Sequence, residues 1–214
     1  MNELIKNELK KRNYNLIPVD MKDLKSIKNL FMKIDNETYK IEGIGNLMII
    51  NMSSIFNLMK MNTIVITPQY KDLSFINIDH IKVNKKNTLI IEMYESCINE
   101  TDLNKLNELK DKYKNIKEYK IKEAWYDSIR YPCSISKITN DKESNEIIMD
   151  YLNNYLDLLS LANNCDYDLK NKKNSDYVNR LIEEGGTAVN SLNKIIGKEK
   201  CSELIRRYMF NIID

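Results

Sequence analysis

The chain has 214 residues, of which 43% are hydrophobic and 30% are charged, and its formal net charge is +2. This composition is typical of a globular protein with one sizeable core, and the small net charge gives no reason to expect nucleic acid or a membrane surface as a partner. No apolar run approaches the roughly 20 residues of a membrane span, and the first residues lack the apolar core of a signal peptide. We therefore expect a cytoplasmic protein that forms a single domain over residues 1–214, with neither nucleic acid nor a membrane as a partner.

The residues that usually hold metals and cofactors are sparse and scattered. The chain has one histidine and four cysteines without a C-x-x-C pair, namely Cys97, Cys133, Cys165 and Cys201. Such spacing argues against zinc and iron–sulfur sites and is typical of free thiols. The sequence also lacks the G-x-G-x-x-G fingerprint of dinucleotide-binding loops. We therefore predict that the protein carries no metal and needs no bound cofactor.

The first part of the chain predicts a helix followed by short strands. Apolar residues recur on one side of a helix at Asn2–Arg12. Strands are predicted at Phe31–Ile34, Thr38–Ile44 and Leu47–Met52, with a turn at Asp35–Glu37 between the first two. A meander of short strands indicates an antiparallel sheet.

Three more strands follow in direct succession. They are predicted at Thr63–Thr67, at Ser74–Val83 and at Asn87–Tyr94, with a hairpin turn at Lys85–Asn87. Pro68 ends the first of them, because proline cannot donate a hydrogen bond to a sheet.

Asp79 is the most informative residue of the middle strand. Side chains alternate between the two faces of a strand, so Asp79 shares its face with Phe75, Asn77 and Ile81. An acid on such an apolar face either points into a cleft or has a buried partner. Asp79 is therefore a candidate pocket acid or, equally, a strand residue satisfied by its neighbours.

The second part of the chain changes to helical periodicity. Helices are predicted at Asp102–Lys114, Ser144–Asn163, Ser175–Glu184 and Lys198–Ile213, with a strand around Ile135 and a polar surface loop at Asn163–Ser175. Strands in the first half and helices in the second predict an α+β fold. We expect a three-layer α/β/α sandwich with a central antiparallel sheet.

The order of several short patterns resembles a known superfamily. Pro68, Leu73, Phe75 and Asp79 follow one another in a strand–loop–hairpin arrangement, and Trp125 precedes the strand around Ile135. Towards the C-terminus, Glu184-Gly185-Gly186-Thr187, Leu192, Gly197-Lys198-Glu199 and Arg207-Tyr208-Met209-Phe210 continue this order. The pattern is similar to that of the ferredoxin-dependent bilin reductases and, more distantly, of the red chlorophyll catabolite reductases. The chain would be a divergent bacterial member.

The resemblance implies a function and a set of site residues. It implies an oxidoreductase that reduces an open-chain tetrapyrrole with electrons from ferredoxin or flavodoxin and without a cofactor of its own. The implied proton donors are Asp79 and, as a substitute for an acid that the family has near Gly186, Glu184. The implied substrate-binding residues are Lys137, Lys82, Asn77 and Thr63, the two lysines as partners of the substrate's propionates and Thr63 near a position where some members have a catalytic histidine.

Two other functions remain open from the sequence. The same fold could bind a tetrapyrrole without reducing it, because the acids expected in the pocket are incomplete. Alternatively, the chain could be an α+β scaffold for contact with another protein. Without a ligand pocket, Lys137 would be a surface lysine and Glu184 a residue at a helix end.

Overall fold

A computed structural model of the chain describes residues 2–54, 56, 58–84 and 86–212. Lys85 of the predicted turn and Ile213 of the last predicted helix lie outside the described residues. The strands are β1 Leu16–Pro18, β2 Ser26–Lys28, β3 Met32–Ile41, β4 Gly45–Ser54, β5 Met59–Pro68, β6 Ile76–Val83, β7 Lys86–Met93 and β8 Ile135–Thr139. They form one antiparallel sheet in the order β1-β3-β4-β5-β6-β7-β8, with β2 also paired to β3.

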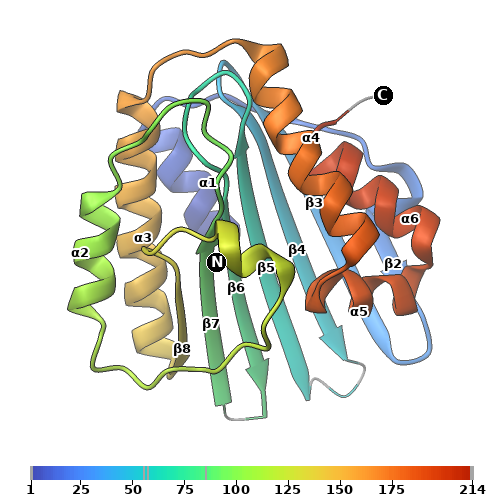
Figure 1. The fold of residues 1–214 in the computed structure, drawn as a ribbon. Coiled ribbons are helices and arrows are strands. Elements are labelled where there is room, and N and C mark those ends of the chain that lie inside the picture. Colours follow the sequence, from blue (N-terminus) through green and yellow to red (C-terminus); the bar gives the residue numbers. More distant parts are fainter. Residues whose placement is uncertain (1, 55, 57, 85, 213–214) are drawn as a thin grey trace.

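Helices cover both faces of this sheet (Figure 1). One face packs against α1 Asn2–Lys11, α2 Asn104–Lys112 and α3 Asp141–Leu161. The other packs against α4 Tyr167–Glu184, α5 Thr187–Ile196, α6 Lys198–Glu203 and a π-helical turn at Leu204–Met209. Two short 3-10 helices lie at Lys22–Leu24 and Trp125–Ile129. The structure confirms the predicted α+β fold and its three layers.

Alternation along the strands divides the core in two. Ile64, Ile78 and Leu89 belong to the cluster under α1–α3, whereas Ile50 and Val65 belong to the cluster under α4–α6. Because residues paired across neighbouring strands share a face, each position of the sheet is assigned to one cluster or the other. We call these two surfaces the α3 face and the α4 face.

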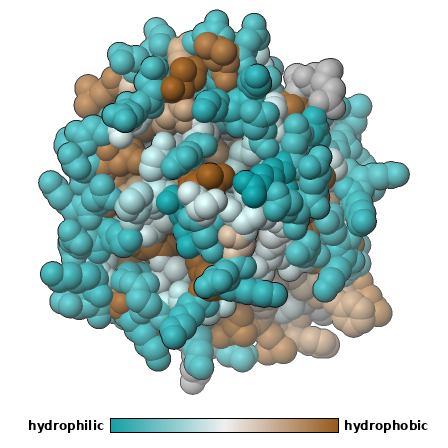
Figure 2. Space-filling view, viewed as in Figure 1, coloured by the Kyte–Doolittle hydropathy of each residue, from teal (hydrophilic) through white to brown (hydrophobic). Residues whose placement is uncertain are grey.

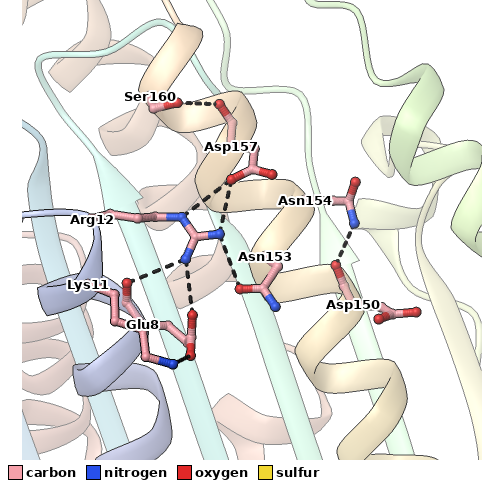
Figure 3. A network of polar contacts seen from close by, with 8 residues as sticks. All are labelled: Glu8, Lys11, Arg12, Asp150, Asn153, Asn154, Asp157 and Ser160. Atoms are coloured by element: carbon pink, nitrogen blue, oxygen red, sulfur yellow. Dashed lines mark hydrogen bonds and ion pairs between the residues drawn. The ribbon is translucent and has the colours of Figure 1, made fainter.

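Polar contacts reinforce the packing of α1 against α3 (Figure 3). The guanidinium of Arg12 lies 3.0 Å from a carboxylate oxygen of Asp157, 3.2 Å from the amide oxygen of Asn153 and 3.1 Å from a carboxylate oxygen of Glu8. Lys11 also contacts Glu8, at 2.6 Å. This network ties the start of the chain to the long helix on the face away from the candidate site described below.

One predicted turn is wrong. Residues 35–37 lie inside the continuous strand β3, although Asp35, Asn36 and Glu37 favour turns. The side chain of Asn36 is buried and donates a hydrogen bond of 2.6 Å to the carbonyl of Leu24, while the hydroxyl of Ser26 donates to Asp35 at 2.7 Å. The segment before β3 thus provides hydrogen-bond partners for polar side chains that otherwise favour a turn over a strand.

The predicted surface loop at Asn163–Ser175 is also wrong, because α4 begins at Tyr167. The carboxylate of Asp166 caps this helix by accepting from the backbone N–H of Leu169 at 2.9 Å. Lys170 and Asn174 are fully buried and donate to backbone carbonyls of the sheet side. The sequence prediction also placed no helix at Thr187–Ile196, where α5 lies.

Candidate functional site

A row of side chains on the α4 face crosses the middle of the sheet at Asp79. The strand register places Thr63 on one side of Asp79 and Ile90 on the other, with Ile50 beyond Thr63 and Ser136 beyond Ile90. Neighbouring strands lie about 4.8 Å apart, so Ser136 is roughly 10 Å from Asp79. The hairpin between β6 and β7 fixes this register, and the alternation of β6 turns Asp79 to this face.

Two neighbours donate hydrogen bonds to the carboxyl group of Asp79. The hydroxyl of Thr63 donates to Oδ1, and the amide Nδ2 of Asn77 donates to Oδ2 at 2.8 Å. Burial raises the pKa of Asp79, and these two hydrogen bonds oppose the rise because they favour the charged form. The net direction is upward, so Asp79 holds a proton more readily than an aspartate in water does.

The sheet around Asp79 is only partly covered. Asp79, Asn77, Ile81, Ile90 and Ser136 are all half-buried, whereas the side chains under α4–α6 are largely inaccessible. Figure 1 shows α4 and α5 to the right of this part of the sheet and the segment between α2 and β8 passing in front of the middle strands in this view. This part of the sheet, where Asp79 lies among isoleucines and polar side chains, is therefore only partly shielded from solvent.

Glu92 is a second acid on the same face, and the sequence prediction missed it. It lies opposite Asn77 in the register and is 8% exposed. Its carboxylate accepts from Arg130 at 3.0 Å, and Arg130 also contacts Asp127 at 2.8 Å. Burial raises the pKa of Glu92, hydrogen bonds from Tyr94 and Arg130 lower it, and the negative charge of Asp79 adds to the rise. The two carboxyl groups therefore influence each other's protonation.

A cavity of about 420 Å³ adjoins Glu92 at the β8 edge. Its lining includes Glu92, Arg130 and Ser136, together with Lys110 of α2 and Tyr119 from the segment that leads to β8. The hydroxyl oxygen of Ser136 is buried and has no hydrogen-bond partner among the described residues. The cavity thus extends the partly covered part of the sheet towards the sheet edge and offers it an unpaired polar group.

Aromatic rings close the other end of the same face. The ring of Phe75 lies 4.7 Å from Tyr177 and 5.0 Å from Phe210, and Tyr94 lies 5.2 Å from Tyr177. Burial raises the pKa of Tyr94 and of Tyr177 far above the usual value, so both hydroxyls stay protonated. This cluster holds α4 and the C-terminal segment against the sheet and bounds its partly covered part on that side.

The structure places both predicted lysines away from Asp79. Lys137 and Lys82 point to the α3 face, so neither shares a surface with Asp79. The ammonium group of Lys137 lies 2.5 Å from a carboxylate oxygen of Glu118 and 3.2 Å from the carbonyl of Ile116, and its side chain is 1% exposed. Lys82 pairs with Asp141 at 2.8 Å. Alternation alone predicts this for Lys82, which lies three residues after Asp79.

Glu184 also lies apart from the Asp79 group. It is the last residue of α4 and is exposed, and it forms an ion pair with Arg180 one helical turn earlier. The guanidinium of Arg180 in turn lies 4.4 Å from the centre of the Trp125 ring. Of the six predicted site residues, the structure brings together Asp79, Thr63 and Asn77.

Glu92 had a signal in the sequence, whereas Arg130 did not. Glu92 is the one acid in the apolar strand Asn87–Tyr94, and a hairpin centred near residues 84–85 pairs it with Asn77. Arg130 reaches Glu92 only because the chain returns to this sheet edge after α2, a path that no local pattern indicates.

Neither a metal centre nor a membrane span is found in the described ranges. No three histidine, cysteine, aspartate or glutamate side chains there are arranged so that they could hold a metal ion. None of the described helices combines the length and apolar character needed to cross a bilayer.

Comparison with known proteins gives a relationship at the level of the fold. No family model matches the sequence, and no curated protein matches it. Among solved structures, the crystal structure of phytochromobilin synthase from tomato in complex with biliverdin is similar, with a TM-score of 0.78 and 15% sequence identity. The match covers 98% of this chain and 82% of the tomato chain. The two proteins share a fold.

Proposed function

We propose that this protein reduces an open-chain tetrapyrrole, with single electrons delivered by ferredoxin or flavodoxin. The proposal rests on Asp79, a half-buried residue on a partly covered sheet face, whose carboxyl group has a pKa raised by burial. The sequence resemblance to bilin reductases and the fold shared with a biliverdin-bound synthase support it. The substrate would lie on the α4 face, over β5–β7.

The reaction needs little more from the protein than a site and protons. Saturating one double bond of the tetrapyrrole takes two electrons from the reduced donor and two protons, and the conjugated substrate can hold the unpaired electron between the two steps. Asp79 would give one proton to the substrate and regain it from solvent, since its face is partly open. Thr63 and Asn77 would hold the carboxyl in place through their hydrogen bonds.

Arg130 replaces the two lysines as the candidate partner of a substrate propionate. Its side chain is 27% exposed, lies on the Asp79 side of the sheet and lines the adjoining cavity. A guanidinium can bind two carboxylates at once, as it does here with Glu92 and Asp127. A propionate would have to compete with one of these acids, so this contact would be weaker than one to an unpaired arginine.

A binding protein without reductase activity is the second candidate. It is favoured by the position of Glu184, which is exposed and paired with Arg180 rather than near Asp79. If Glu92 does not serve as the second acid, the site has one proton donor, and the two-proton reaction would depend on solvent for the other.

The proposal is tested by titrating the protein with biliverdin and recording the absorbance of the mixture. Binding predicts a saturable change in the bilin spectrum. Under anaerobic conditions, a ferredoxin-regenerating system should then bleach or shift that spectrum. Saturable binding without a reduction product would favour the binding protein, and no binding at all would contradict both candidates and favour the interaction scaffold.

A further inference from the structure

We propose that the hairpin end of the sheet is a contact surface for an anionic lipid bilayer. Large apolar side chains gather there on three separate chain connections, and exposed lysines lie close to them. The apolar tips, as we call them, are Leu30, Phe31, Phe56, Leu58 and Val83, which are 77%, 70%, 83%, 58% and 45% exposed. The inference rests on this surface alone and does not depend on the proposed reductase activity.

The strand register brings the apolar tips to one end of the molecule. Met32 at the start of β3 pairs with Ser54 at the end of β4, so the β2–β3 and β4–β5 connections are neighbours. Met59 at the start of β5 pairs with Val83 at the end of β6, which places the β6–β7 turn beside them. Figure 1 shows these strand ends together at the lower end of the sheet.

Exposure on this scale is unusual for apolar side chains. Single exposed leucines or phenylalanines are ordinary, but a group of them on adjacent connections marks an interaction site. Figure 2 shows apolar residues along the lower edge of the molecule, where these connections lie. No described element covers the apolar tips, whereas other large apolar residues of the same strands are packed in the core, among them Ile34, Ile50 and Ile64.

Lysines give this end a positive charge. Lys28, Lys60 and Lys86 are exposed and lie within three residues of an apolar tip, and no ion pair to any of them occurs in the described part of the chain. Lys33 and Lys82 stand nearby, each paired with one aspartate, Asp35 and Asp141 respectively. This end therefore carries three lysines for which the described residues offer no ion-pair partner, although the whole chain carries a net charge of only +2.

This arrangement fits a bilayer surface better than a protein partner. The apolar groups lie at the strand connections and the lysines lie beside them or further along the strands, which suits a surface where acyl chains meet lipid phosphates. A stable protein interface instead needs a contiguous, shaped patch in which the apolar groups form a packed centre. The overall charge predicted no membrane partner, because it averages over a chain in which the basic end is offset by acids elsewhere.

Contact of the apolar tips with a bilayer would also bring the membrane surface close to the candidate site. Met59, Met61 and Ile81 continue the half-buried apolar surface from the tips along β5 and β6 towards Asp79. An apolar ligand dissolved in the membrane surface could therefore reach the partly covered sheet face along a continuous apolar path.

Sedimentation with lipid vesicles tests the inference on the protein alone, without a tetrapyrrole. The wild type should sediment with vesicles that contain phosphatidylglycerol and far less with pure phosphatidylcholine. Phe31→Ser/Phe56→Ser should weaken binding about tenfold or more, since two large apolar groups are removed. Leu161→Ser/Leu169→Ser is the matched control, because those two leucines are 76% and 55% exposed elsewhere and should leave binding unchanged.

A second variant reports insertion directly. Trp125 is the single tryptophan of the chain, so Phe56→Trp adds a fluorophore at a tip, and its emission should shift to the blue with phosphatidylglycerol vesicles while that of Leu161→Trp should not. Equal sedimentation of the wild type and the Phe31→Ser/Phe56→Ser variant would overturn the inference. A wild type that sediments with neither kind of vesicle would also overturn it. A wild-type dimer that forms without lipid, and that is lost in the Phe31→Ser/Phe56→Ser variant, would overturn it too, because the tips would then contact a second copy of the chain.

Discussion

Asp79 is held in a setting that makes its negative charge costly to the folded protein. Burial disfavours the carboxylate, and hydrogen bonds from Thr63 and Asn77 compensate only in part. Because the folded-state pKa lies above the unfolded value, the stability that this group contributes is present at low pH. It is lost as the pH rises through the folded-state pKa.

We therefore predict that Asp79→Asn stabilises the protein at neutral pH. The gain should be about 0.5–2 kcal/mol, the usual size of a favourable single substitution, and it should shrink as the pH is lowered towards about 4. Urea unfolding at several pH values measures it. Asp111→Asn, which makes the same change in charge at an exposed position of α2, should show no such trend. A destabilised Asp79→Asn at every pH would mean that the carboxylate is favourably held.

Breaking the ion pair between Glu92 and Arg130 should destabilise the protein mainly because it leaves a buried charge unpaired. Glu92 is 8% exposed, so Arg130→Leu leaves a buried carboxylate without its cation. We expect Arg130→Leu to lower the free energy of unfolding by about 2–3 kcal/mol, less than the 3–5 kcal/mol of a fully buried pair, because the arginine is partly exposed. Adding Glu92→Gln should restore most of the loss, and thermal unfolding of the three variants checks this. Equal losses in the single and double variants would contradict it.

For single residues, the sequence predicts which face of the sheet a side chain points to better than it predicts which residues that side chain contacts. Alternation gives Asp79 and Asn77 one face, and the strand register adds Thr63 to it. Lys137 was misjudged because its partner Glu118 comes from a segment that pairs with β8 only in the folded chain. Arg130 was missed for the same reason, since its contact with Glu92 spans 38 residues.

Helix α4 shows how a polar stretch becomes a structural element. The amine of Lys170 lies 2.8 Å from the carbonyl of Leu73 and 2.6 Å from that of Ser96, and the side chain is completely buried. Burial lowers its pKa, although Cys97 and Asp72 oppose this. Two hydrogen bonds to the sheet side thus anchor a helix that its composition would leave as a loop.

Lys170→Met should therefore destabilise the protein strongly, although it replaces a charged residue by an apolar one. It leaves two buried carbonyls without their donor, and each such group costs about 1–3 kcal/mol. We expect a loss of about 2–4 kcal/mol in chemical unfolding. Lys172→Met, on the exposed side of the same helix, should change stability by less than about 0.5 kcal/mol. Similar values for the two variants would show that Lys170 is not an anchor.

The elements that were predicted correctly share a strong local signal. The alternating strands β5–β7 and the long helix α3 are set by periodicity. Two of the errors fall at 35–37 and 163–175, where polar side chains find partners distant in sequence, namely the carbonyls of Leu24, Leu73 and Ser96. No local pattern contains that information.

For the whole molecule, a ligand on the α4 face should stabilise the fold. It would contact β5–β7 and the helices that pack beside them, so it would bind the folded chain and not the unfolded one. A ligand at 100 times its Kd adds about 2.7 kcal/mol. For a chain of this size, we expect biliverdin at that level to raise the melting temperature by about 5–10 °C. A chelator should leave the melting temperature unchanged, and a drop on chelation would reveal a structural metal.

We propose that Asp79 donates a proton to the reduced tetrapyrrole, and the Asp79→Asn variant tests this role. Asp79→Asn keeps the size of the side chain and can still accept from Thr63, but it has no proton to give. Binding of biliverdin and anaerobic turnover with a ferredoxin-regenerating system are measured for both proteins. We predict similar binding and a rate about 10²–10⁴-fold lower for Asp79→Asn, the usual cost of removing a positioned acid. Turnover at the wild-type rate by Asp79→Asn would contradict the account.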